Sequence, residues 1–103
     1  MMDYEIMEFD TIKFVADKKP LGFDFTKKLG NGETITTAVF SNVSIDKTDS
    51  NDSAMLLGVE NINLGIVMHM LQNGIAGNKY KLSVVITTSG GRTLYAEGIY
   101  KVK

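Results

Sequence analysis

The sequence predicts an all-β protein, an antiparallel β-sandwich of about seven strands in a single domain spanning residues 1–103. Three observations support this fold class. Segments with alternating apolar and polar residues are rich in β-branched and aromatic side chains. No window sustains an apolar period near 3.6 residues with helix caps. The length suits one hydrophobic core, and a 44% hydrophobic content argues against disorder.

The first half of the chain contains three expected strands. They are residues 11–16, 22–26 and 34–45. Pro20 should lie in a loop before the second strand, because proline lacks the N–H that a central ladder position needs. The apolar phase changes within the third segment, which predicts a bulge or bend near residues 38–41. Residues 1–10 are expected to form an extra N-terminal strand or an arm.

The second half adds four more expected strands. They are residues 54–60, 63–71, 80–88 and 92–103. The polar segment DKTDSNDS, residues 46–53, precedes them. Its three aspartates lack the spacing and central glycine of a calcium loop, so a solvated loop is favoured over a metal site. SGG, with Gly90 and Gly91, should form the turn of the last hairpin.

NLGIVMHML, residues 63–71, is apolar on both faces, which is unusual for a sandwich strand with one face toward solvent. We expect its second face, which bears Val67, His69 and Leu71, to contact another subunit, because exposed apolar patches often mark interfaces. An overlying loop or a helical segment would also explain the pattern.

The sequence contains no motif of catalytic or ligand-binding residues. His69, the only histidine, has no nucleophile or carboxylate beside it in sequence. The glycines near the C-terminus fit neither a phosphate loop nor a dinucleotide-binding loop. We therefore expect no catalytic residue, no cofactor and no metal ligand. Gly74 and Gly77 instead frame a turn before Tyr80, which resembles the tyrosine corner of Ig-like sandwiches, where the hydroxyl bonds to upstream backbone.

Charge and apolar content exclude several partners. The net charge is −1 and Arg92 is the only arginine, so a nucleic-acid surface is not expected. Apolar runs fall short of the ~20 residues that span a bilayer, so no membrane contact is expected. The acidic N-terminus lacks the features of a secretory signal, and the absence of cysteine fits synthesis in a reducing cytoplasm.

Two long motifs resemble a known family. FVADKKPLGFDFTKKLGNGETI, residues 14–35, and LQNGIAGNKYKLSVVITTSGGRT, residues 71–93, are similar to small proteins encoded among the head and tail structural genes of tailed bacteriophages. The matching residues are Asp17, Pro20, Phe23, Asp24, Phe25, Leu29, Gly32, Glu33, Thr34, Ile35, Gly74, Gly77, Tyr80, Thr87, Gly91 and Arg92. Tryptophans typical of such relatives are missing here, and residues 1–10 are additional.

The resemblance implies an Ig-like sandwich that is a non-enzymatic virion component, made in the bacterial host cytoplasm. Its place would be the capsid surface, as a decoration protein, or the head-tail junction. Expected partners are capsid, portal or tail proteins, and a homo-oligomer is an option. The acidic N-terminal segment would pair with the basic C-terminal strand of the same chain or of a neighbour.

An alternative function is an Ig-like binding module for carbohydrate or a host surface. Such sites often expose aromatic side chains, and the sequence offers Tyr4, Tyr95 and Tyr100. An enzyme is disfavoured because no convergent set of titratable groups is evident.

Overall fold

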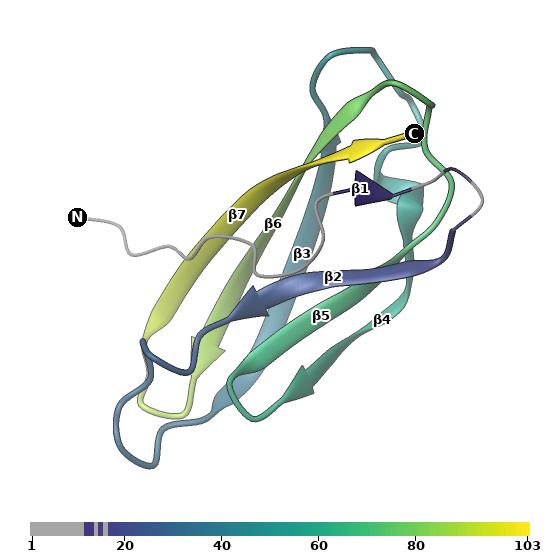
Figure 1. Cartoon of the computed structure of the whole chain (residues 1–103). Coiled ribbons are helices and arrows are strands. Elements are labelled where there is room, and N and C mark those ends of the chain that lie inside the picture. Colours follow the sequence, from purple (N-terminus) through teal and green to yellow (C-terminus); the bar gives the residue numbers. More distant parts are fainter. Residues whose placement is uncertain (1–11, 14, 16) are drawn as a thin grey trace.

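Two β-sheets face each other in the computed structural model, which describes residues 12, 13, 15 and 17–103 (Figure 1). The four-stranded sheet has the order β1 (Ile12–Lys13), β7 (Thr93–Val102), β6 (Lys79–Thr88) and β3 (Ile35–Ser44). The three-stranded sheet has the order β2 (Lys19–Asp24), β5 (Ile66–Leu71) and β4 (Leu56–Asn63). Neighbouring strands are antiparallel except β1 and β7, which are parallel. The prediction of an all-β sandwich with seven strands is confirmed.

The core lies between the sheets and is built by side chains at alternate strand positions. In β6 the inward residues are Tyr80, Leu82, Val84 and Ile86, and all are buried. Phe23 of the opposite sheet lies against Phe40, with ring centroids 6.4 Å apart. Alternation of this kind is what a pleated strand with one buried face requires. The strict period of two explains why the sequence predicted β6 and β7 most clearly.

Pro20 lies within β2, not in a loop as expected. It pairs with Met70 of β5 in an antiparallel ladder. The position is tolerated because β2 is an edge strand, where one side of the backbone has no ladder partner. The sequence could show the proline but not the strand order that makes it acceptable.

The bulge in β3 also differs from the expectation. The register with β6 shifts between Ile35 and Thr37, so the irregularity is at Thr36 and not near residues 38–41. From Ala38 onward, inward and outward residues alternate without interruption. The apolar side chains that suggested a later bend, such as Val39 and Val43, point outward and are exposed.

Gly22 holds β2 close to β5. A Cβ atom at this position would overlap the carbonyl oxygen of Val67 and approach Met68, so no side chain fits. Glycine in a strand interior often marks such a close backbone approach. The GFDF motif therefore provides two buried phenylalanines and also the contact that lets β5 pack beside them.

Short connections gather at the two ends of the sandwich (Figure 1). One end carries the connection before β3, the β4–β5 turn and the β6–β7 turn, which are joined by backbone bonds such as Ser89 N–H to Thr34 O. The other end carries residues 45–55, which include the 3-10 turn η1 (Ser53–Met55), and the segment between β5 and β6. Residues 1–10, the expected extra strand or arm, lie outside the described residues.

Candidate interaction surfaces

Tyr80 connects the two loops at the η1 end. Its side chain is fully buried, and the hydroxyl accepts a hydrogen bond of 2.9 Å from the backbone N–H of Ile75. The hydroxyl also donates to Oδ2 of Asp49 at 2.7 Å. Burial raises the pKa of Tyr80, which keeps the hydroxyl protonated as a donor. The bond to upstream backbone is the geometry of a tyrosine corner.

The predicted turn residues Gly74 and Gly77 lie in the same segment. Both have positive φ angles, 105° and 87°. A Cβ at Gly74 would lie 2.9 Å from a methyl group of Val102 and 3.0 Å from the methyl of Met55. Gly77 donates its N–H to the carbonyl of Val102. The turn therefore packs directly on the end of β7, and a side chain at position 74 would crowd Val102 and Met55.

Asn78 is a buried hydrogen-bonding centre that the sequence analysis missed. Its Oδ1 accepts from the backbone N–H of Lys47 at 2.8 Å, and its Nδ2 donates to the carbonyl of the same residue at 3.0 Å. Its own backbone carbonyl accepts from Val102. Its place two residues before Tyr80 is the only signal that the sequence offers. A side-chain amide is well suited here because it offers a donor and an acceptor together.

Asn42 and Tyr100 form a second buried polar pair, also missed. The Tyr100 hydroxyl donates to Oδ1 of Asn42 at 2.6 Å, and Nδ2 of Asn42 donates to the carbonyl of Asp52 at 2.8 Å. Burial strongly raises the pKa of Tyr100. Tyr100 is therefore a core residue, and it cannot serve as the exposed carbohydrate platform that was considered. Tyr95 is half-buried and donates to Glu97, and Tyr4 lies outside the described residues.

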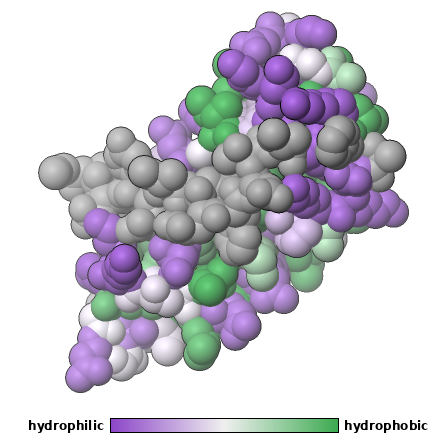
Figure 2. Space-filling model, in the orientation of Figure 1, coloured by the Kyte–Doolittle hydropathy of each residue, from purple (hydrophilic) through white to green (hydrophobic). Residues whose placement is uncertain are grey.

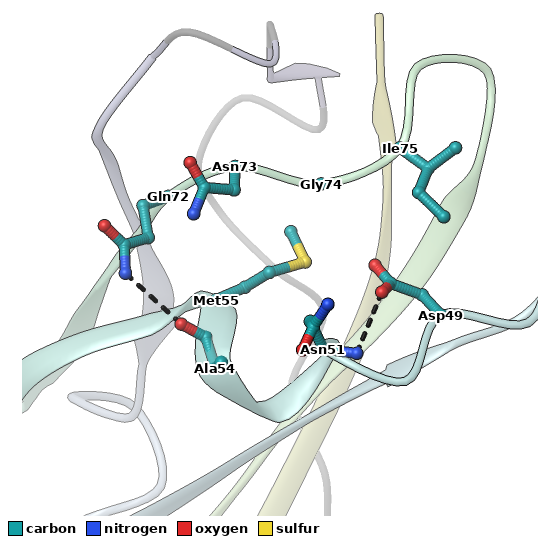
Figure 3. Close-up of a pocket in the computed structure, with 8 residues that line it drawn as sticks. All are labelled: Asp49, Asn51, Ala54, Met55, Gln72, Asn73, Gly74 and Ile75. Atoms are coloured by element: carbon teal, nitrogen blue, oxygen red, sulfur yellow. Dashed lines mark hydrogen bonds between the residues drawn. The ribbon is translucent and has the colours of Figure 1, made fainter.

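A pocket of about 380 Å³ opens between the two loops at this end. Figure 3 shows Met55 between the segment of Gln72 to Ile75 on one side and Asp49 and Asn51 on the other. Several polar groups that line the pocket form hydrogen bonds within or between the loops. Gln72 Nε2 donates to the carbonyl of Ala54, and the Asp49 carboxylate accepts from the Tyr80 hydroxyl and from the Asn51 N–H. Its lining offers hydrogen bonds but no nucleophile paired with a base.

Two of the three aspartates in residues 46–53 accept hydrogen bonds from nearby backbone groups. Asp52 accepts from the N–H groups of Ser44 and Ser53. Asp49 accepts from Asn51, as described. Among the described residues, no three histidine, aspartate or glutamate side chains gather in a group that could hold a metal ion. Local capping of this kind explains an aspartate-rich loop without an ion.

An ionic cluster ties together the loops at the other end. Arg92, at the last turn, bonds to both carboxylate oxygens of Glu33, with 2.6 Å between Nη2 and Oε1, and also to the carbonyl of Lys28. Thr88 and the Gly30 N–H donate to the same carboxylate. The Arg92 guanidinium is the largest cause that lowers the pKa of Glu33 to about 2.

The β6–β7 turn is formed around Gly90 and Gly91. Gly91 has a φ of 81° and donates its N–H to the Thr88 carbonyl. A Cβ at Gly90 would lie 2.7 Å from Oε2 of Glu33, so the absence of a side chain lets the carboxylate approach. The expected hairpin is present, and Gly90 makes room for the ionic cluster.

The interface expected at Val67, His69 and Leu71 must be corrected. These side chains point into the core, and even His69 is only 7% exposed. The His69 ring contacts Phe40 edge-on, with 5.3 Å between ring centroids, and its Nδ1 lies 3.0 Å from the Met70 carbonyl oxygen. With both faces of the segment apolar, the sequence could not indicate which one faces the other sheet. The second apolar face is on the opposite side of β5.

The outer face of the three-stranded sheet carries this second set of apolar side chains. We call it the methionine face, and it comprises Pro20, Leu57, Ile66, Met68 and Met70. Met70 lies between Pro20 and Leu57 in the strand register and is 37% exposed. Leu64, in the β4–β5 turn two residues before Ile66 of the methionine face, is 83% exposed and has a φ of 59°. Flexible methionine side chains adapt well to a partner surface.

The outer face of the four-stranded sheet is more mixed. Val39, Val85 and Tyr95 form one cross-strand row, and Val43, Lys81 and Ile99 form another. Lys81 lies 3.5 Å from Glu97 in an exposed ion pair. In the view of Figure 2, hydrophobic side chains likewise form separate patches between hydrophilic ones. This face therefore mixes apolar and charged side chains.

Comparison with known protein families shows which family this chain belongs to. Residues 13–99 match the family described as Podophage GP4 fiber-tail adaptor protein gp77. The chain belongs to this family. No curated protein matches it.

The match to the gp77 adaptor family extends from Lys13 of β1 into β7, so it includes both sheets and both clusters of loops. The expected kinship with phage structural proteins is thereby supported at the level of a tail-associated virion protein. A family of adaptors implies binding to other virion components. In the described part of the chain, no helix is long and apolar enough to cross a membrane.

Proposed function

We propose that this protein is a non-enzymatic tail adaptor of a podophage-like virion, which joins other virion proteins near the head-tail region by protein contacts. The match of residues 13–99 to the fiber-tail adaptor family carries this proposal. A place on the capsid surface, the other position considered, is less favoured because the family description refers to tail and fiber.

The strand order supports an Ig-like relationship. When the strands are lettered A to G in chain order, the three-stranded sheet reads B-E-D and the other reads A-G-F-C. Ig constant-type domains have the sheets ABED and CFG, so only the short first strand differs in sheet. The hydroxyl of Tyr80, near the start of strand F, bonding to upstream backbone adds a second feature of that fold.

The methionine face is the contact surface that we propose for a virion partner. This face takes the place of Val67, His69 and Leu71 as the proposed contact surface, because those three side chains are buried. The reason for a contact is unchanged: residues 63–71 have a second apolar face, and exposed apolar patches often mark interfaces. Although Asp24 lies opposite Ile66 farther along this face, the central row of Pro20, Met70 and Leu57 has no charged side chain. Such a row suits the dehydrated centre of an interface, where charged residues are depleted.

A matched pair of surface substitutions tests this assignment. Met70 and Val85 lie on opposite outer faces and are 37% and 40% exposed. We expect Met70→Lys, supplied during infection in place of the normal protein, to lower its amount in purified particles at least tenfold. Val85→Lys should leave incorporation unchanged. Thermal unfolding of both purified variants checks that each still folds.

The outcomes separate the alternatives. If Val85→Lys abolishes incorporation and Met70→Lys does not, the contact lies on the four-stranded sheet. If neither changes incorporation, no sheet face is the contact. Quantitative mass spectrometry of particles tests the position, because a tail adaptor should be present in a small ring-like number of copies and a capsid decoration in hundreds. Absence of the protein from particles would refute the proposed function itself.

A further inference from the structure

Two asparagines of the chain are each followed by glycine, and their surroundings differ. Asn31–Gly32 lies in the connection before β3, and Asn73–Gly74 lies between β5 and β6. Asparagine is a chemically labile residue, and a following glycine has no side chain to shield its backbone nitrogen. Both asparagines are exposed to solvent, so exposure does not distinguish them. What differs is how firmly the backbone around each one is held.

Deamidation of an asparagine begins with a reaction inside the chain. The glycine nitrogen gives its proton to a base in solution and attacks the side-chain carbonyl carbon of the asparagine. A C–N bond closes a five-membered succinimide ring, and the amide nitrogen leaves as ammonia. Water then opens the ring at one of its two carbonyls, which gives aspartate or isoaspartate, so the overall change is hydrolysis of one amide. Because the two reacting atoms must first approach, the peptide group after the asparagine has to rotate.

The peptide group between Asn31 and Gly32 is the middle of an exposed turn. Glu33 donates its N–H to the Gly30 carbonyl at 3.0 Å, and a φ of 78° at Gly32, without a positive φ at Asn31, indicates a type II turn. Within the part of the chain that the structure describes, the Gly32 N–H has no hydrogen-bond partner. Beyond the chain neighbours of Gly32, no described atom lies within 4 Å of the place where its Cβ would be. This peptide group is therefore free to rotate when the turn opens.

The backbone around Asn73 is held by hydrogen bonds at three successive peptide groups. They join the Gln72 N–H to the Met55 carbonyl, the Asn73 carbonyl to Nζ of Lys13 and the Ile75 N–H to the Tyr80 hydroxyl. Gly74 also lies close to methyl groups of Val102 and Met55. Rotation of the peptide group after Asn73 moves the carbonyl that Lys13 binds at 2.8 Å, so ring closure at Asn73 must first break this contact.

We propose that Asn31 is a site of spontaneous deamidation in the folded protein and that the contacts of its loop protect Asn73. The difference arises from the tertiary structure, because the two Asn–Gly pairs are the same dipeptide. The reaction needs only water and no partner, so the proposal is independent of the proposed function.

The modification at position 31 acts on the ionic cluster of Glu33 and Arg92. Isoaspartate lengthens the backbone between Gly30 and Glu33, which changes the spacing on which two bonds depend. One is the turn bond, and the other is the 2.7 Å bond from the Gly30 N–H to Oε1 of Glu33. Aspartate keeps the backbone length and adds only a charge two residues from Glu33. Isoaspartate therefore loosens the cluster more than aspartate does.

Incubation of the purified full chain in a mildly alkaline buffer tests the proposal. Peptide mass spectrometry of timed samples, with chromatographic separation of isoaspartate from aspartate, measures conversion at both sites. We expect the folded protein to convert Asn31 at least tenfold faster than Asn73. In guanidinium chloride the two pairs lose their different surroundings, and their rates should agree within threefold. Asn31→Gln is the matched control, because it keeps the amide but requires a larger ring, and conversion at position 31 should fall at least tenfold.

Several results would contradict this inference. Equal rates at Asn31 and Asn73 in the folded protein would overturn it, and so would a rate ratio that guanidinium chloride leaves unchanged. Conversion of Asn31 without isoaspartate would exclude the cyclic route. The effect on the cluster has its own test: the separated isoaspartate form should unfold at a lower temperature than Asn31→Asp, and equal midpoints would refute that effect.

Discussion

Replacing Tyr80 with phenylalanine tests the bond that joins the two loops at the η1 end. The substitution removes one oxygen and keeps the ring, which stacks on Tyr100 with 5.6 Å between centroids. Packing should therefore survive. What is lost is the acceptor for the Ile75 N–H, 2.9 Å away, and the donor to the Asp49 carboxylate, 2.7 Å away.

The expected cost follows from those two bonds. A backbone hydrogen bond contributes about 1 kcal/mol net, and a bond to a carboxylate contributes about 1.5–3 kcal/mol when fully buried. The loop at Asp49 is partly exposed, so a water molecule can replace part of the lost hydrogen bond to the Asp49 carboxylate. We expect Tyr80→Phe to lower the free energy of unfolding by about 2 kcal/mol. For a domain of this size, that lowers Tm by roughly 8–16 °C.

Urea unfolding followed by circular dichroism measures this difference, with Tyr95→Phe as the matched control. The Tyr95 hydroxyl donates to Glu97 on the outer sheet face, where water can take its place, so its loss should cost less than about 0.5 kcal/mol. A Tyr80→Phe variant within 0.5 kcal/mol of the normal protein would refute the structural role of the corner. Equal losses in both variants would show that the effect is not specific to this end.

Three further predictions concern pH, backbone conformation and the buried amide. Because the pKa of Glu33 falls from its usual 4.5 to about 2 on folding, its stabilisation is complete above pH 4.5 and is lost as the pH falls toward 2; Glu33→Gln should flatten unfolding curves over that window. Gly74→Ala should destabilise by about 2–3 kcal/mol, from its positive φ and its contacts with neighbouring side chains. Asn42→Ala should cost about 3 kcal/mol because it leaves the Tyr100 hydroxyl without its acceptor.

Each of these has a control or a contrary result. Gly32 also has a positive φ but has open space around its Cβ position, so Gly32→Ala should cost less than Gly74→Ala; equal costs would remove the packing argument. An unchanged acid slope in Glu33→Gln, measured by thermal unfolding between pH 2 and 5, would show that Arg92 does not stabilise the folded carboxylate. Asn42→Ala unfolding at the normal urea concentration would contradict the buried network.

The strands themselves follow from local pattern, and the sequence predicted most of them. A period of two in YKLSVVITT, followed by Ser89, Gly90 and Gly91, predicts a half-buried strand and a hairpin from local sequence alone. The turn before Tyr80 is likewise predicted by neighbouring residues, Gly74 and Gly77. Such features depend on interactions within a few positions, so reasoning from sequence captures them.

Only the tertiary structure decided which face of residues 63–71 is buried and why Pro20 can lie in a strand. Both faces of β5 are apolar, so either could meet the core. The register with β2 sets His69 beside Leu21 and Val67 beside Phe23, on the face that is buried. Pro20 is acceptable because β2 is an edge, which depends on strand order. The polar contacts of Asn42 with Tyr100 and of Asn78 with Lys47 join residues 58 and 31 positions apart. No local pattern signals such pairs, because their partners meet only when the two sheets and their loops close around the core.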